Sequence, residues 1–386
     1  MRKNTSIKVN SKVKNSSNEA NSVAENAFFC TTPFHVLGCL AISHHVANKT
    51  DIYITNQFKD SLRIAGFLKT EGLFHDVIYI DAQEKRIEVI AATGIKKIWT
   101  DFHSLLQYLW NCIRIDKTVQ RYLHTDYVYR RVFIASNSMA GRYAILSYIK
   151  RKKKFSIWQY DDGLGSYSNA VAEAIPLYDR FFRTIFFGRK AVKLKRTWCL
   201  FSPEYYYLMN GKSRHIHHVP ELGSEQRKLL FKMYDMDSLP KVDPRTLFLD
   251  APNEGFTVEG WEMYQRARSK TIEVAGDVLI KRHPRDLQMS DEERKIASVP
   301  FEILCMNWDM SDKIIISSRS SAMYTPKLLF DQEPVLIFLC LLLEKGVSGY
   351  KTYGDIDNIR AIYRDKSRVL LPKTEDELID AINRFL

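Results

Sequence analysis

The sequence predicts an α/β protein of two domains, each built around a parallel β-sheet covered by helices. The chain has 386 residues, about twice the usual length of a single domain. Short apolar runs alternate with helix-length segments, which is the order that parallel strands and crossover helices require. The alternation occurs twice, and prolines and a glycine interrupt it between His218 and Asp243.

The first series of elements follows a polar and basic N-terminus. Residues 1–25 are rich in Lys, Asn and Ser and contain no apolar stretch typical of a secretory signal, so we expect a disordered basic tail. The run from Phe28 to Thr32 predicts the first strand, and a helix is expected from about Phe34 to Val46. Further strands of this half are predicted at 51–55, 76–80, 132–135 and 155–159.

The second series starts near Thr246 and ends with a helix, which Thr374 and Glu377 predict as a capping box. We place the domain boundary so that the domains span 26–222 and 223–386. Two Rossmann-like, doubly wound domains facing a central cleft form the arrangement known as GT-B, in which the carboxyl ends of both sets of strands line the cleft. The strands of the second half are predicted at 246–250, 277–281, 302–305, 313–317 and 334–339.

The charge balance indicates a polyanionic partner. Lys and Arg total 57 against 45 Asp and Glu, which gives a net charge of +12 and a pI near 9.2. This suits nucleic acid, an anionic membrane surface, or charged glycans and nucleotides. Nucleic-acid binding is the distant alternative, because Lys152–Lys154 lie beside aromatic residues but no helix-turn-helix, RNA-recognition or zinc signature occurs. No apolar stretch reaches the roughly 18 residues of a membrane span, so we expect a soluble or peripheral protein.

Neither a metal site nor a bound cofactor is expected. The six cysteines lack the close spacing of zinc sites and disulfide frameworks, which favours a reducing compartment. The sequence contains no P-loop, no Gly-x-Gly-x-x-Gly after the first strand and no His-Glu-x-x-His pair. His215, His217 and His218 are neighbours, but a strand would present only His215 and His217 on one face.

Two adjacent acids follow a predicted strand. Asp161 and Asp162 come just after the strand at 155–159, and Gly163 permits a tight turn that presents at least one acid to the cleft. Like-charge proximity and partial burial raise the pKa of a carboxylate, which suits general-base catalysis. The alternative interpretation is an Asp-Gly turn with solvated acids.

A cationic segment ends the second strand of the second series. Lys281, Arg282 and Arg285 surround His283, and Pro284 ends the strand. Cations and an imidazole at a strand end can hold a phosphate, and the imidazole can protonate it as it leaves. The alternative interpretation is a basic surface loop.

Three further positions have weaker or more general signals. Ser320 and Ser321 follow an apolar strand, where hydroxyls and the free N–H groups of a helix start form an anion site; the alternative is a simple serine N-cap. Glu302 opens a predicted strand, where it can accept hydrogen bonds from a ribose. Asn253 follows the strand at 246–250 and is a candidate substrate contact.

The order of these motifs resembles the bacterial CMP-sialic acid sialyltransferases. The motifs that carry the resemblance are Asp161-Asp162-Gly163, His283-Pro284 and Ser320-Ser321. The opening Cys30-Thr31-Thr32-Pro33-Phe34-His35 looks like the first strand and loop of the lipooligosaccharide and capsule branch, glycosyltransferase family 52. The ordered set spans most of the chain and implies two Rossmann-like domains, an acceptor and catalytic-base domain followed by a nucleotide-sugar donor domain.

The resemblance implies an inverting transfer of sialic acid without a metal. It implies Asp162 as the general base, with Asp161 as the second choice, and His283 as a contact to the donor phosphate and a general acid toward CMP. CMP carries one phosphate, so imidazole and hydroxyl contacts can replace a divalent ion. The other expected contacts are Ser320, Ser321, Pro284, Lys281 and Arg282 at the donor phosphate, Glu302 at the ribose, and Thr32, His35, Asn253 and Arg285 at the substrates.

The resulting hypothesis is a cytoplasmic sialyltransferase that acts on capsular polysaccharide or lipooligosaccharide. Its partners would be the nucleotide-sugar donor, the glycan acceptor and an anionic membrane. The aromatic and arginine-rich segment 178–187 is one candidate for membrane contact, although it also reads as an amphipathic helix covering a sheet. The alternatives keep the fold and change the donor to CMP-Kdo or a UDP-sugar.

Overall fold

A computed structural model gives the structure of the protein. It describes residues 24–46, 48–81, 106, 109–111, 113–120, 123, 128–135, 139–151, 153–161, 163, 196–210, 216–219, 222–239, 243–252, 256–283, 289–318, 320–344 and 354–386. The predicted tail, up to residue 23, and the segment 178–187 lie outside the described residues. Glu25 already joins the fold, because its carbonyl accepts the N–H groups of Arg130 and Arg131.

The first sheet contains seven parallel strands in the order β3-β2-β1-β4-β5-β6-β7. The central β1 is buried along its whole length, as expected for a parallel strand covered on both faces. Phe28 of β1 stacks on Phe133 of β4 with ring centroids 4.1 Å apart. The order reverses between β1 and β4, which makes that position the topological switch point. The strands are β1 Asn26–Cys30, β2 Thr50–Thr55, β3 Asp76–Ile80, β4 Arg131–Ile134, β5 Ser156–Tyr160, β6 Arg196–Cys199 and β7 Ile216–His218.

Helices connect these strands. Helix α1 starts where Thr32 accepts the N–H of His35 (3.2 Å) and Pro33 supplies the fixed φ of a first helical residue. Helix α2 ends at Gly72, whose φ of 63° is the left-handed conformation typical of a helix end. The helices are α1 Pro33–Ser43, α2 Ser61–Glu71, α4 Ile115–Val119, α5 Met139–Lys150, α8 Pro203–Asn210 and α9 Ser224–Met233.

The second sheet contains five parallel strands in the order β12-β11-β10-β8-β9, with its switch point between β8 and β10. Its central strand β10 is apolar at three of four positions and fully buried. The strands are β8 Thr246–Leu249, β9 Val278–Lys281, β10 Ile314–Ser317, β11 Val335–Phe338 and β12 Val369–Leu370. The helices are α10 Val258–Ala275, α11 Asp291–Ser298, α12 Phe301–Asn307, α13 Thr325–Phe330, α14 Gly354–Ile362 and α15 Glu375–Asn383.

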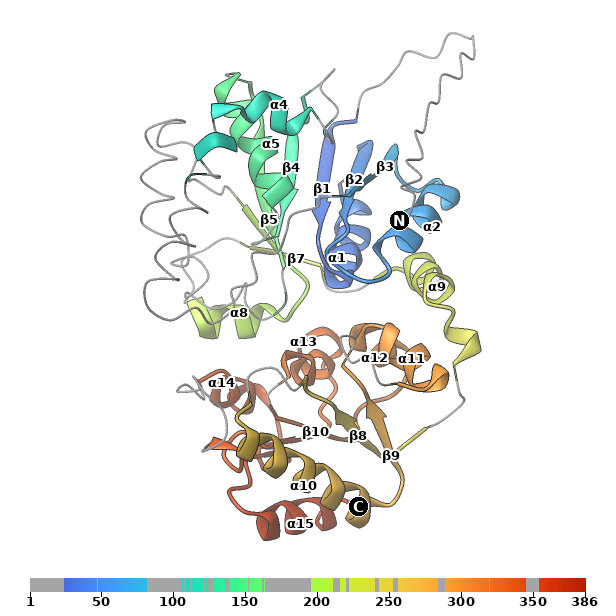
Figure 1. Cartoon of the computed structure of the whole chain (residues 1–386), viewed down its shortest axis with the longest axis vertical. Coiled ribbons are helices and arrows are strands. Elements are labelled where there is room, and N and C mark those ends of the chain that lie inside the picture. Colours follow the sequence, from blue (N-terminus) through green and yellow to red (C-terminus); the bar gives the residue numbers. More distant parts are fainter. Residues whose placement is uncertain are drawn as a thin grey trace, which may run out of the picture.

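The two halves form the GT-B arrangement of two doubly wound domains. They are stacked along the long axis of the molecule, with α8 and α9 on one side of the junction and α11, α12 and α13 on the other (Figure 1). Helix α9 packs against α1 and α12, and α8 packs against α14. The Ser202 N–H of the first domain donates to the Leu328 carbonyl of the second (2.9 Å). The proposed boundary at 222/223 falls between β7 and α9.

Most predicted strands are confirmed to within one or two residues, but the strand at 302–305 is wrong. These residues lie in α12, in which Phe301, Ile303 and Cys305 are buried. A short apolar run fits a strand and a buried helix equally well, so periodicity alone cannot separate them. Strands β6, β7 and β12 were not predicted; β12 has two residues and β7 has three, two of them histidines, which is too short for a periodic signal. At the terminal helix, Thr374 accepts the Glu377 N–H as predicted (3.2 Å).

Two findings bear on the expected environment of the protein. None of the five described cysteines forms a disulfide, and four of them are buried. Among the helices of the described ranges, none is both long and apolar enough to cross a bilayer.

A buried polar cluster anchors β2 at the end of the first sheet remote from the second domain. Asp51 is fully buried and accepts the Tyr129 hydroxyl (2.6 Å), which also lies 2.6 Å from the Tyr53 hydroxyl. The other carboxylate oxygen of Asp51 lies 2.7 Å from Nδ1 of His75. Burial and the nearby charges of Tyr53 and Asp51 raise the pKa of Tyr129 well above its usual value, so its hydroxyl stays a donor.

We expect Asp51→Ala to destabilise the fold by about 3 kcal/mol, because it leaves buried hydroxyl donors without an acceptor. Urea unfolding measures the loss. Asp277→Ala, at an exposed position between α10 and β9, is the control and should change the free energy of unfolding by less than about 0.5 kcal/mol. Equal effects of the two substitutions would contradict a structural role for the cluster.

Candidate active site

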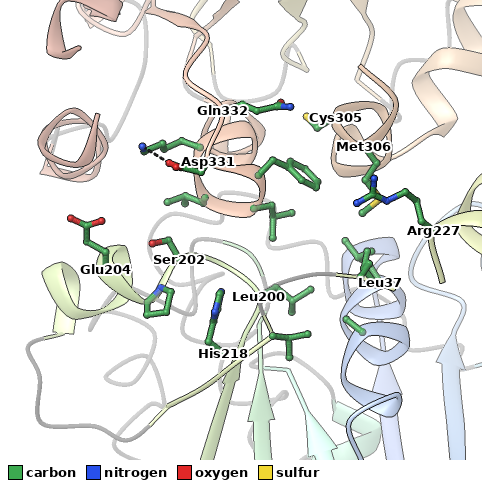
Figure 2. A pocket seen from close by; sticks show the side chains of 18 of the residues that line it. Leu37, Leu200, Ser202, Glu204, His218, Arg227, Cys305, Met306, Asp331 and Gln332 are labelled. Atoms are coloured by element: carbon green, nitrogen blue, oxygen red, sulfur yellow. Dashed lines mark hydrogen bonds and ion pairs between the residues drawn. The ribbon is translucent and has the colours of Figure 1, made fainter. Parts of the chain in front are cut away.

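A cleft of about 810 Å³ lies between the two domains. That volume is in the range of sites that bind drug-sized ligands, and a nucleotide sugar is of that size. The first domain contributes α1, the connection from β6 into α8, the end of β7 and the start of α9. The second contributes α12, α13 and the residues after α13, and Figure 2 shows side chains from both domains converging on this space.

The cleft follows the expected GT-B geometry on one side only. Leu200, Ser202 and His218 line it at the carboxyl ends of β6 and β7. On the other side, its lining comes from α12 and α13, so the predicted lining by carboxyl ends of the second sheet is wrong for this cleft. The physical reason is the helix layer, because α11–α13 stand between the second sheet and the first domain (Figure 1).

His218 is the titratable side chain that reaches the cleft from the edge strand β7 (Figure 2). Burial lowers its pKa below the ordinary value, and a hydrogen bond with the Leu200 backbone acts in the opposite direction. A half-buried imidazole that is mostly neutral near pH 7 can accept or relay a proton. In the sequence, His218 stands in a histidine cluster without metal-site spacing, and its place at the end of a strand is the signal that marks it as a cleft residue.

Charged groups of the second domain line the opposite wall. Lys327 is nearly buried, and its ammonium contacts Asp331 (2.6 Å) and Glu333 (2.5 Å). The hydrogen bond from Lys327 holds the pKa of Asp331 below its usual value, so both acids remain ionised partners of the cation. Asp331 has a φ of 51°, the left-handed conformation that ends α13 and directs the chain into β11. Arg227 and Glu204 place further charges on the first-domain side.

Asp161 lies behind the cleft wall. It is fully buried, and one carboxylate oxygen accepts the Leu200 N–H at 2.6 Å, which ties the end of β5 to the end of β6. Leu200 in turn lines the cleft. Gly163 has a φ of 74°, so the predicted turn after Asp161 exists and uses a conformation natural to glycine. Asp162, the predicted base, lies outside the described residues.

Thr32 and His35 sit at the switch point of the first sheet. Thr32 caps α1, as described above. The His35 ring is fully buried, and its Nδ1 lies 3.1 Å from the Thr31 N–H and 2.9 Å from the Thr31 hydroxyl. With no exposed surface, the ring offers no face to a substrate in this structure and instead shapes the connection between β1 and α1.

Lys281, Glu302 and Cys305 form a mostly buried group under the second-domain side of the cleft. The Lys281 ammonium donates to the carbonyls of Ile296 and Ala297 (both 3.4 Å) at the end of α11. Burial lowers the pKa of Lys281 to about 8 and raises that of Glu302, while each charge partly stabilises the other. Of the three, Cys305 lines the cleft, and Lys281 points into the domain interior toward α11.

Arg282 and His283 follow β9 at the carboxyl edge of the second sheet. The Arg282 guanidinium lies 3.6 Å from the nearly buried carboxylate of Asp250, which also has Arg268 at 3.9 Å. The Tyr264 hydroxyl donates to the other oxygen of Asp250 (2.6 Å), so this acid is held firmly between β8 and α10. A backbone hydrogen bond and, to a smaller extent, the charges of Arg282 and Arg268 lower the pKa of Glu293, so this edge holds two guanidinium groups and two acids next to His283.

Ser320 and Ser321 follow β10. The Ser320 hydroxyl accepts the Ala322 N–H (3.3 Å) and caps the short 3-10 helix Ser321–Tyr324. The serine N-cap interpretation therefore applies to Ser320, while Ser321 is exposed. Asn253, Pro284 and Arg285 lie outside the described residues.

The structure thus distributes the predicted residues over several places. Asp161 stands behind Leu200 of the cleft, and Lys281 and Glu302 belong to the buried group next to Cys305. Thr32 and His35 lie at the switch point of the first sheet, and Arg282, His283, Ser320 and Ser321 lie at the carboxyl edge of the second sheet. None of the predicted site residues that the structure describes lines the cleft itself. Within the described ranges, no group of three or more His, Cys, Asp or Glu side chains is arranged to hold a metal ion.

Comparisons with known proteins add little. No protein-family model and no curated protein matches the chain. Solved structures with a similar course of the chain include a putative UDP-N-acetylglucosamine 2-epimerase from Listeria monocytogenes (11% identity, TM-score 0.47, 95% of this chain and 93% of that one). Others are UDP-GlcNAc 2-epimerase from Methanocaldococcus jannaschii (11%, 0.49, 94% and 92%) and the glycosyltransferase SnogD from Streptomyces nogalater (11%, 0.49, 94% and 94%). At these identities and TM-scores, the similarity says nothing about the activity of this chain.

Asp161→Ala should cost about 2 kcal/mol of stability, because the buried Leu200 N–H loses its acceptor. Asp161→Asn retains an amide oxygen for that N–H and should cost clearly less. Urea unfolding of both variants checks the order, with Glu204→Ala as a control on an exposed acid of the same cleft. If the alanine and asparagine variants are equally stable, the hydrogen bond from the Leu200 N–H to Asp161 does not stabilise the fold.

Lys281→Met should remove the pH-dependent cost of burying the Lys281 charge, while Glu302 loses its partner, so a changed pH dependence of stability is the expected result. The folded-state pKa of Lys281 is about 8, below its ordinary 10.5, so the unfolded chain holds the proton more tightly. The free-energy cost of burying the charged Lys281 is therefore complete below pH 8 and disappears as the pH rises toward 10.5. Thermal unfolding of the wild type and of Lys281→Met between pH 7 and 9.5 should show a difference in melting temperature that changes with pH. A difference that stays constant would mean that the substitution acts through packing alone.

Proposed function

We propose that the chain is a glycosyltransferase that binds a nucleotide-sugar donor between its two domains. One observation carries the proposal: two domains, each built on a doubly wound parallel sheet, enclose a cleft of about 810 Å³. Ligands of such sheets bind outside the carboxyl ends of the strands, where the acid motif follows β5, the histidine motif follows β9 and the serines follow β10.

The finer proposal is transfer of sialic acid from CMP-sialic acid to a capsular or lipooligosaccharide glycan. It is supported by the order of the three motifs and by their places at strand ends. Arg282 and Arg268, near His283, supply guanidinium groups of the kind that bind phosphates and carboxylates, and Asp250 holds them in place. The proposal includes transfer at the cytoplasmic side of the membrane, where nucleotide sugars are available.

In the proposed reaction, the bond between the anomeric carbon and the CMP phosphate oxygen breaks as the acceptor oxygen bonds to the opposite face of that carbon. Asp162 takes the proton of the acceptor hydroxyl, and His283 donates a proton to the phosphate of departing CMP. The transition state is cation-like, so a carboxylate on one side and cations at the leaving phosphate both stabilise it. Asp161, which precedes Asp162 in the sequence, anchors the end of β5 through its bond with the Leu200 N–H.

A UDP-sugar or CMP-Kdo donor is the alternative within the same fold. The cleft volume accommodates any of these donors, and the described lining contains no feature that reads the base. Nucleotide binding therefore decides between them.

The deciding experiment is calorimetric titration of the whole protein with CMP, CDP, UMP and UDP in EDTA. We expect CMP to bind most tightly, and His283→Ala to weaken it at least about tenfold through loss of a charge-assisted hydrogen bond. His218→Ala tests whether the nucleotide instead occupies the described cleft, and the exposed His45→Ala is the control. Preferential binding of UDP would replace the CMP-sugar proposal, and failure of all four nucleotides to bind would overturn a glycosyltransferase.

If CMP binds, transfer assays with CMP-sialic acid and CMP-Kdo on a lipooligosaccharide acceptor separate these two donors. Asp162→Asn should then abolish transfer while leaving CMP affinity unchanged, because a base acts on the acceptor and not on the nucleotide. Retained transfer in Asp162→Asn would remove Asp162 from the mechanism.

A further inference from the structure

The end of the first domain remote from the second carries an apolar and cationic helix face. Residues Leu106, Leu109–Asn111 and Ile113 are helical and lead into α4. A turn at Arg114 joins Trp110 to α4: the Arg114 N–H donates to the Trp110 carbonyl and the Thr118 N–H to the Arg114 carbonyl (both 3.0 Å). Figure 1 shows α4 at the tip of the molecule, far from the junction between the domains.

This helical segment carries large apolar side chains on its exposed side as well as on its buried side. Ile115 and Val119 point inward and are fully buried in the core beside α5. Leu106, Trp110 and Ile113 are 48%, 52% and 58% exposed. Trp110 and Ile113 are three residues apart, so their side chains are neighbours on a helix surface. Together with Leu106 they form an exposed apolar arc, which indicates an interaction surface.

Cations surround this apolar arc. The Arg114 guanidinium stacks on the Trp110 ring at 3.9 Å, and Lys117 continues the same face. Lys150, Lys153 and Lys154 lie exposed at the end of α5, which packs against α4. The nearby acid Asp116 is already occupied, because it lies within 3.1 Å of Lys150 and 3.0 Å of Arg151.

The start of the chain adds charge at the same end. Glu25 bonds to the backbone at the start of β4, beside the exposed Arg130. The sequence before Ala24 contains five Lys or Arg and a single acid, Glu19.

We propose that this end of the first domain docks on an anionic lipid bilayer. Trp110, Ile113 and Leu106 would enter the boundary between headgroups and acyl chains, and the surrounding Lys and Arg would pair with anionic headgroups. The combination of apolar side chains and cations favours a bilayer over nucleic acid, because nucleic-acid phosphates would leave the exposed Ile113 and Leu106 without an apolar partner. The surface is separate from the cleft, so the proposal does not depend on which donor the protein uses.

Sedimentation of the full chain with vesicles tests the proposal. We expect binding to phosphatidylcholine vesicles that contain phosphatidylglycerol, and at least about tenfold weaker binding to pure phosphatidylcholine vesicles. Trp110→Ser with Ile113→Ser should lower affinity for the anionic vesicles about tenfold or more. Val258→Ser with Leu62→Ser removes two apolar groups elsewhere that are more exposed than Trp110 and Ile113, and should leave vesicle binding unchanged. Melting temperatures of all variants confirm that each is folded.

A second pair of variants separates the two parts of the surface. Arg114→Glu with Lys117→Glu should weaken binding to anionic vesicles about tenfold, and rising salt should reduce binding of the wild type. Quenching of Trp fluorescence by brominated acyl chains should occur in the wild type and decrease in Trp110→Phe. The proposal is overturned if the Trp110/Ile113 variant binds vesicles like the wild type, or if the chain binds RNA oligonucleotides and no vesicles.

Discussion

Parallel strand pairing is the constraint on which the rest of this structure depends. A parallel strand must be followed by a crossover back to the same edge, so every loop after a strand in one sheet emerges on one side. This brings residues as far apart in sequence as Thr32, Asp161 and His218 to the carboxyl edge of the first sheet. The same rule places Asp250, His283 and the serines after β10 at the carboxyl edge of the second.

The cleft depends on how the two sheets are covered. Helices α12 and α13 lie on the face of the second sheet that is directed at the first domain, so their side chains, and not the strand ends, form that wall (Figure 1). Lys327 pairs with two acids of the second domain, whereas the opposite wall carries one cation, Arg227, one acid, Glu204, and the imidazole of His218. The direct bond from Ser202 to Leu328 joins the walls and sets their spacing.

The two ends of the first domain differ in structure. The junction of the domains carries the cleft and the buried groups that support it, of which the Asp161 carboxylate is the clearest example. The opposite end of the first domain holds the amino edges of the strands, the Asp51 cluster and the exposed face of Trp110. An enzyme that modifies a surface glycan from the cytoplasmic side needs both a donor site and a way to stay near the membrane, and the two proposals assign these roles to different ends.

The sequence by itself determined the fold class and nearly all the interior strands, because a buried parallel strand such as β10 is a continuous apolar run between turn residues. It also showed which strand ends carry acids, cations and hydroxyls. Only the tertiary structure decided that 302–305 is helical, that His35 and Asp161 are buried, and that His218 reaches the cleft. The physical reason is that burial and contact depend on what packs against a residue from distant parts of the chain, and local periodicity contains no information about that neighbour.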